Sequence, residues 1–126
     1  MSNYSVKEFD AIKNSCQYSY FLLYINERCQ FEDFKKEIKS NALYNKQYNQ
    51  ILATMEQISD QHTLTAKKFR NIKGVGRKDI FEFKSKDLRI YVLKKNPNMY
   101  IILGGYKANQ DNDINLLKER LKYIEI

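Results

Sequence analysis

The chain has 126 residues, which is enough for a single domain over residues 1–126 with one modest hydrophobic core. Hydrophobic residues make up 43% and charged residues 29%, a composition that excludes an intrinsically disordered chain. No apolar run approaches the roughly 20 residues that cross a bilayer, and residues 1–10 lack the basic start and apolar stretch of a signal peptide. We therefore expect a cytoplasmic protein with no membrane partner.

Positive charge is concentrated in the second half of the chain. The net charge is +7, yet residues 1–60 carry seven Lys or Arg against eight Asp or Glu, whereas residues 61–126 carry fifteen against seven. Eleven basic and three acidic residues fall within 67–95. Such a local excess attracts polyanions and favours nucleic-acid binding. The alternative is a solvated face that only keeps the protein soluble.

The chain offers few ligands for a metal and no disulfide framework. It has two cysteines, Cys16 and Cys29, without a CxxC motif, and its one histidine is His62. Metal sites are usually marked by clustered ligands, so we predict neither a metal nor another cofactor. The thiols are more typical of small buried apolar groups, and we expect His62 to be structural or exposed.

The first half of the chain predicts a strand between helical segments. Ser5 and Glu8 have the spacing of a capping box, which can begin a short helix within residues 1–14. Residues 18–25 are rich in aromatic and β-branched side chains, which indicates a strand that is apolar on both faces and central in a sheet. A helix over this run is the rival interpretation, because a short apolar run does not establish its period.

Two amphipathic helices are predicted next. Apolar residues recur at three- and four-residue spacing over residues 31–38 and again over 43–58, and the second helix ends near Ser59. Asn41 lies between the two patterns, so a helical hairpin is the simplest connection. Residues 60–65 are polar and break the period.

The second half predicts three antiparallel strands and a closing helix. The strands cover 80–84, 88–92 and 100–103, with turns at 85–87 and 96–98. In the second strand three apolar residues face one way and two others face the opposite way: Leu88, Ile90 and Val92 against Arg89 and Tyr91. Asn112 or Asp113 can cap this helix, and four residues form its apolar face: Ile114, Leu117, Leu121 and Ile124.

These elements predict an α+β fold, in which an antiparallel sheet of about four strands packs with two N-terminal helices and one C-terminal helix. The stretch from Phe69 to Tyr123, about 55 residues, resembles the RelE/HigB family of toxin ribonucleases. The resemblance rests on a basic segment with glycines and on three strand motifs in order: IFEFK at 80–84, LRIY at 88–91 and IILGGYK at 101–107.

The resemblance implies a RelE-like toxin that cleaves mRNA on the ribosome. In such cleavage the RNA 2′-hydroxyl attacks the adjacent phosphate, and cations replace a metal in stabilising the added negative charge. It also implies a cognate acidic antitoxin as partner, since a helix bearing carboxylates blocks a basic groove.

Five residues are candidates for catalysis by this resemblance: Arg89, Lys84, Lys107, Tyr123 and Glu82. Arg89 matches a strand arginine that contacts the transition state, while Lys84 and Lys107 match basic residues that close two strands. Tyr123 is the nearest candidate for proton transfer, and Glu82 is a second one as a base. The alternatives are a surface Arg89 paired with Glu82, and ordinary exposed lysines.

Five further residues are candidates for RNA binding: Lys73, Arg77, Lys78, Tyr91 and Tyr106. The three basic residues flank two glycines, in a loop whose backbone can approach phosphates. The two tyrosines can stack on an unpaired base. A plain connecting loop and packing of the tyrosines in the core are the alternatives.

Two alternative functions would use the same basic sheet. A non-catalytic RNA- or DNA-binding module predicts salt-sensitive binding without cleavage. A protein-interaction domain predicts an acidic protein partner. Growth arrest on expression that Arg89→Ala abolishes without unfolding the chain would favour the toxin over both.

Overall fold

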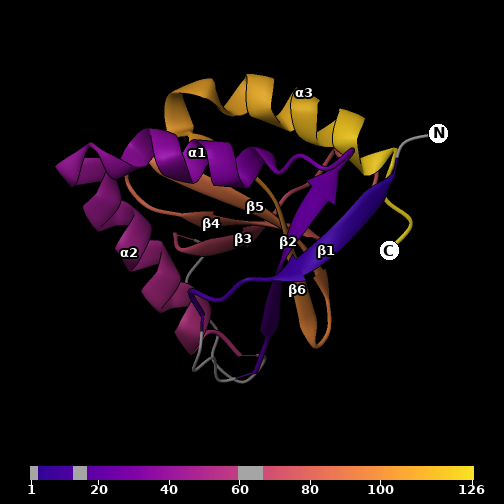
Figure 1. Cartoon of the computed structure of the whole chain (residues 1–126), viewed down its shortest axis with the longest axis horizontal. Helices are drawn as coiled ribbons and strands as arrows, with labels where there is room; N and C mark the ends of the chain where they lie inside the picture. Colours follow the sequence, from indigo (N-terminus) through magenta and orange to yellow (C-terminus); the bar gives the residue numbers. More distant parts are fainter. Residues whose placement is uncertain (1–2, 13–16, 60–66) are drawn as a thin grey trace.

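A computed structural model describes residues 3–12, 17–59 and 67–126 of the chain. Within these residues one mixed sheet has the strand order β1-β2-β6-β5-β4-β3, with α1 and α2 on one face and α3 on the other (Figure 1). The elements are β1 (Tyr4–Glu8), β2 (Ser19–Ile25), α1 (Gln30–Lys39), α2 (Ala42–Gln57), β3 (Phe69–Asn71), β4 (Ile80–Lys84), β5 (Leu88–Lys95), β6 (Asn98–Tyr106), the 3-10 turn η1 (Lys107–Asn109) and α3 (Gln110–Leu121).

Strand β6 is an interior strand of the sheet and is buried on both faces. It pairs in parallel with β2 and antiparallel with β5. The register with β5 shifts between Tyr91 and Val92, which leaves Ile102 as an extra residue of β6. Met99 and Ile101 face α1 and α2, whereas Ile102 belongs to the core under α3. The prediction of an interior strand at 100–103 is confirmed.

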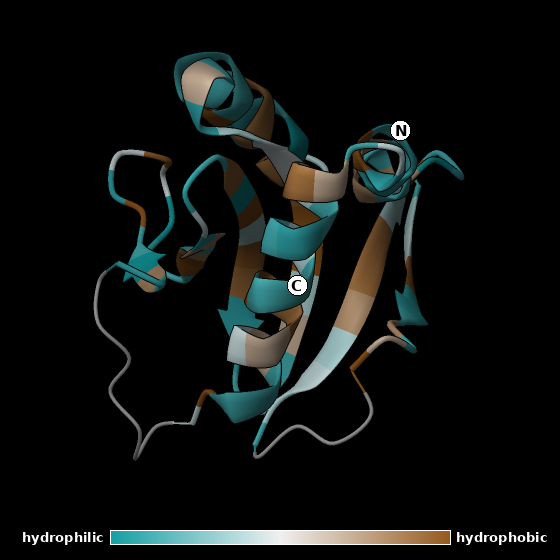
Figure 2. Ribbon diagram, turned by 90° about the vertical axis from the view of Figure 1, so that its left-hand side faces the viewer, coloured by the Kyte–Doolittle hydropathy of each residue, from teal (hydrophilic) through white to brown (hydrophobic). Residues whose placement is uncertain are grey.

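Each face of the sheet has its own hydrophobic core. Figure 2 shows brown apolar positions along the strands of the sheet. The core under α1 and α2 contains, among others, Tyr20, Phe31, Phe34, Ile38, Ile51, Met55, Phe83, Leu88, Ile90 and Val92. The core under α3 contains, among others, Leu23, Ile72, Ile80, Tyr91, Leu93, Leu103, Leu117, Leu121 and Ile124.

The helical hairpin and the strand at 18–25 are confirmed. Helices α1 and α2 are joined at Asn41, whose side-chain oxygen accepts a hydrogen bond of 3.1 Å from the Tyr44 amide and so caps α2. Cys29 is buried as expected, and burial raises the pKa of its thiol. Cys16 and His62 lie outside the described residues.

The predicted helix at Ser5 and Glu8 is wrong, because these residues belong to strand β1. They pair with Tyr24 and Phe21 of β2 in an antiparallel ladder, and both are exposed. A short polar edge strand takes its conformation from its partner, so its own sequence shows no strand period.

The sheet also differs from the expected one in size and direction. It has six strands within the described residues instead of about four, and the β2–β6 pair makes it mixed instead of antiparallel. Strands β1 and β3 add an edge on each side. Strand β3 has three residues, too few for a periodic pattern to be seen.

The C-terminal helix begins earlier than expected, because η1 leads directly into it. Asn109 occupies the N-cap position of α3, so Asn112 and Asp113 lie in the first turn. The Asp113 carboxylate packs against Gly105, where an added Cβ would overlap it. The predicted apolar face of α3 is confirmed, because its four residues belong to the core under α3 or pack against it: Ile114, Leu117, Leu121 and Ile124.

In the part of the chain that is described, no helix is both long and apolar enough to cross a membrane.

Gly104 is required by the contact between β6 and α1. A Cβ added at this buried residue would overlap the Phe34 ring, and Gln30 holds its backbone by two hydrogen bonds of 2.8 Å. We expect Gly104→Ala to lower the free energy of unfolding by about 1–3 kcal/mol, measured by urea denaturation. Combining it with Phe34→Leu should cost less than the sum of the two single losses. Additive losses would contradict the proposed overlap.

Candidate functional site

The turn between β4 and β5 is fixed against α2 by one buried glutamine. Gln47 donates a hydrogen bond of 2.7 Å to the Asp87 carboxylate, and its side-chain oxygen accepts bonds of 2.7 Å from the Ser85 hydroxyl and the Asp87 amide. Gln47 is only 4% exposed. Three short bonds around a buried amide give this turn a defined position, and a cleft lies on each side of it.

The first cleft, which we call the lysine cleft, has a volume of about 560 Å³. Its lining residues come from α2, from the segment before β3 and from the β4–β5 turn: Gln50, Thr54, Lys67, Lys68, Lys84, Ser85 and Lys86. Among these lining residues there are four cations and no carboxylate. A concave surface of one charge sign concentrates ligands of the opposite sign, so this cleft is suited to a polyanion.

Lys84 connects the lysine cleft with further cations on the face of the sheet that α3 covers. Burial lowers the pKa of Lys84, and the charges of Arg70, Arg89 and Lys107 lower it further, while Glu82 opposes them. Lys84, Arg89 and Lys107 are three of the predicted catalytic residues, and they are brought together here. The result is a fixed positive field around one lysine.

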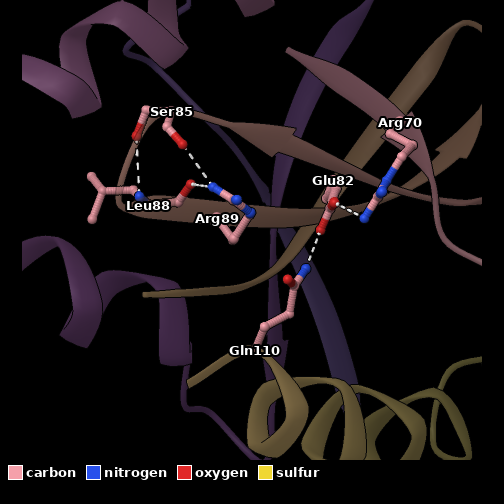
Figure 3. Close-up of polar contacts among 6 residues, drawn as sticks. All are labelled: Arg70, Glu82, Ser85, Leu88, Arg89 and Gln110. Atoms are coloured by element: carbon pink, nitrogen blue, oxygen red, sulfur yellow. Dashed lines mark hydrogen bonds and ion pairs between the residues drawn. The ribbon is translucent and has the colours of Figure 1, made fainter. Parts of the chain in front are cut away.

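Arg89 lies beneath this surface and holds the turn. The alternation of β5 is as predicted, but the face that Arg89 enters is covered by α3, so Arg89 is only 5% exposed. Its Nη1 donates to the carbonyls of Ser85 at 2.7 Å and Leu88 at 2.8 Å (Figure 3). Its Nε has no hydrogen-bond partner among the described residues. The alternative of a surface Arg89 paired with Glu82 is therefore wrong.

Glu82 joins two strands and a helix in place of pairing with Arg89. It is fully buried, and its two oxygens accept from Arg70 at 2.8 Å and from Gln110 at 2.6 Å (Figure 3). Both oxygens are occupied, so Glu82 is placed as a structural anion. Tyr91, on the same face, is fully buried and cannot stack on a base in this conformation, which corrects its predicted role. Burial raises the pKa of the Tyr91 hydroxyl.

The predicted loop cations lie at the other end of β4. Lys73, Arg77 and Lys78 precede Ile80, and the four steps along the strand from Ile80 to Lys84 span roughly 13 Å. Arg77 forms an ion pair of 2.7 Å with Asp79 and donates to a backbone oxygen of Ile126. The two glycines of the loop have φ angles of 81° and 85°, so backbone conformation explains them. This loop is not part of the lysine cleft.

Tyr123 is also separate from the cations. It follows α3 and lines a pocket with Ile25, Arg28 and Leu116, whereas Lys107 begins η1, which leads into the other end of α3. The twelve residues of α3 span about 18 Å. Tyr123 is therefore not placed for proton transfer near Lys84, and this prediction is corrected.

The second cleft, which we call the aromatic cleft, has a volume of about 730 Å³. It lies on the other side of the Gln47-bound turn, and its lining residues are Glu37, Tyr44, Asp87, Tyr106, Lys107, Ala108 and Asn109. The predicted base-binding Tyr106 is thus partly accessible here. Burial, followed by the neighbouring Glu37 carboxylate, raises the pKa of the Tyr106 hydroxyl.

Sequence reasoning missed most of the lysine cleft. Lys67, Lys68 and Lys86 lie within the basic segment 67–95, but their common location depends on α2 and on the turn. Their charge was the only signal in the sequence. In the described part of the chain, no three His, Cys, Asp or Glu side chains gather as a metal site.

A scan against protein-family models and searches of the curated proteins and of the solved structures found no match to this chain. The resemblance to the RelE/HigB family therefore stays a prediction that rests on the motifs described above.

Asp113 provides a pH-dependent contribution to stability. Its Oδ2 is buried without a hydrogen-bond partner among the described residues, and burial raises the pKa of its carboxyl above the ordinary value of 3.8. The folded chain then binds this proton more readily than the unfolded chain does. The contribution of Asp113 to the free energy of unfolding should fall as the pH rises from 3.8 through the raised pKa.

We expect Asp113→Asn to be more stable than the native chain at pH 7, and the difference to shrink as the solution is acidified. Urea denaturation of both proteins across this pH range measures the difference directly. A difference that stays constant with pH would contradict the buried-charge explanation.

Proposed function

We propose that the chain binds single-stranded RNA along the lysine cleft and cleaves it as a metal-independent toxin endoribonuclease, with mRNA on the ribosome as its substrate. The observation that supports this proposal is the setting of Lys84. Its pKa is lowered by burial and by three neighbouring cations, and it lines a cleft whose described lining has no carboxylate.

In the proposed reaction the RNA 2′-hydroxyl loses its proton to water, and the 2′-oxygen forms a bond to the adjacent phosphorus as the bond to the 5′-oxygen breaks. The products are a 2′,3′-cyclic phosphate and a 5′-hydroxyl. Lys84 and Lys107 stabilise the negative charge that develops on the phosphate oxygens. A lysine with a lowered pKa is also a better proton donor, so Lys84 protonates the departing 5′-oxygen. Arg89 acts as a positioning residue, because it binds the carbonyl of Ser85 in the β4–β5 turn, directly after Lys84.

A second candidate is an RNA-binding module that does not cleave. The burial of Arg89 and the occupied oxygens of Glu82 favour it, because two predicted catalytic groups are held in structural contacts. Both candidates use the same lysine cleft and differ only in whether the bound RNA is cut.

The positive charge of the lysine cleft supports an acidic protein as its partner in this proposal. An antitoxin segment bearing carboxylates is complementary to Lys67, Lys68, Lys84 and Lys86, and it would compete with RNA for them. We place the cognate antitoxin there.

Lys84→Gln tests the cleavage proposal. Inducible expression of the native chain in a bacterium should arrest growth and create new mRNA 5′ ends, because the message is cut. Removal of one transition-state cation should reduce cleavage by roughly 100-fold and restore growth.

Lys118→Gln is the matched control, since Lys118 is exposed in the second half of α3 and the substitution removes the same charge. It should arrest growth like the native chain. Normal growth and intact messages with abundant native protein would leave the non-cleaving module as the better explanation.

Salt dependence tests the binding that both candidates share. Lys67 and Lys86 are exposed in the lysine cleft, so changing both to Gln should remove two phosphate contacts without unfolding the chain. The slope of log binding constant against log salt for single-stranded RNA should then become shallower by about 1.4. Fluorescence anisotropy measures the slope, and an unchanged slope would place the RNA elsewhere.

A further inference from the structure

The aromatic cleft differs in chemistry from the lysine cleft beside it. Two tyrosine rings, Tyr44 and Tyr106, lie with centroids 5.3 Å apart and planes inclined by 53°. Two carboxylates, Glu37 and Asp87, line the same cleft. These carboxylates would repel a phosphate from their part of the cleft, where a flat ring with N–H donors is complementary to both features, whereas Lys107 lines the same cleft and can face a phosphate.

The two clefts are joined through the β4–β5 turn. Ser85 lines the lysine cleft, Asp87 lines the aromatic cleft, and Gln47 binds both residues. Lys107 lines the aromatic cleft, and its charge also acts on Lys84. A phosphate held near Lys84 and Lys107 would therefore present an attached base to the aromatic cleft.

We propose that the aromatic cleft binds one unpaired RNA base that carries an exocyclic amino group, and that it discriminates against uracil. This inference rests on the proposed RNA binding by the lysine cleft. Tyr44, which is partly buried, offers a ring for stacking. Asp87 and Glu37 accept hydrogen bonds from the amino group of the base.

Cytosine and uracil separate this proposal from general stacking, because the two bases have the same ring size. Cytosine carries an amino group where uracil carries a carbonyl oxygen, which would face the carboxylates. Cytosine can make a hydrogen bond to a charged acceptor that uracil cannot make. This difference in binding free energy corresponds to roughly tenfold discrimination between the two bases.

The experiment compares cytosine and uracil homopolymers of equal length, 2′-O-methylated so that they are not cleaved, by fluorescence anisotropy with the full chain. The native protein should bind the cytosine polymer about tenfold more tightly. Tyr44→Leu should weaken binding of both polymers by roughly tenfold, because stacking is lost.

Glu37→Gln and Asp87→Asn give the sharper result. Each introduces an amide N–H that can donate to the uracil carbonyl, so each variant should bind the uracil polymer more tightly than the native chain does. A gain of affinity cannot come from misfolding. Glu37 is exposed, and its substitution leaves the Gln47 contacts intact.

The outcomes separate this inference from the proposed function. Equal binding of both polymers by the native chain, with no gain in the variants, would overturn the base site and leave RNA binding in place. Failure to bind either polymer at low salt would overturn the proposed function together with the inference.

Discussion

Strand β6 must be covered on both faces, and the rest of the structure follows from this requirement. Met99 and Ile101 are buried under α1 and α2, while Ile102 and Leu103 are buried under α3. An apolar strand in the interior of a sheet is stable only when both faces are shielded from water. The two helical layers therefore divide the basic residues of this region into two groups. One group lies beneath α3, and the other lies around the β4–β5 turn.

This division separates the cations held beneath α3 from the accessible lysines of the lysine cleft. The cation of Arg89 lies under α3, where it binds backbone carbonyls, and Arg70 is paired with the buried Glu82. The buried Glu82 carboxylate has both oxygens satisfied, so its burial costs much less than that of an unpaired carboxylate. Lys84 lies between these buried groups and the lysine cleft, so its proton affinity reflects both environments.

Much of the fold could be predicted because its long elements have clear periods. The faces of β5 were predicted correctly from alternation, and the helical hairpin from its apolar spacing. Alternation alone could not show that α3 covers the face that Arg89 enters, since docking of a helix is a tertiary event. Lys73 and Arg77 belong to the same basic segment of the sequence as Lys84, but the length of β4 separates them from Lys84 in the fold. The cleft that contains Lys67, Lys68 and Lys86 also depends on α2, which lines it. A polar segment separates this helix from Lys67 in the chain, so the sequence does not show that they meet.

The parallel pairing of β2 with β6 has a consequence for the order of folding. Ser19 lies beside Asn98, so two strands at the middle of the sheet meet only after 79 residues of chain have closed a loop. Contacts of such large sequence separation slow folding. During synthesis β2 and the α1–α2 hairpin emerge first, and one edge of β2 stays unpaired until β6 is made. An unpaired apolar edge is a site for association with other chains, so the nascent protein is most exposed to aggregation in this interval.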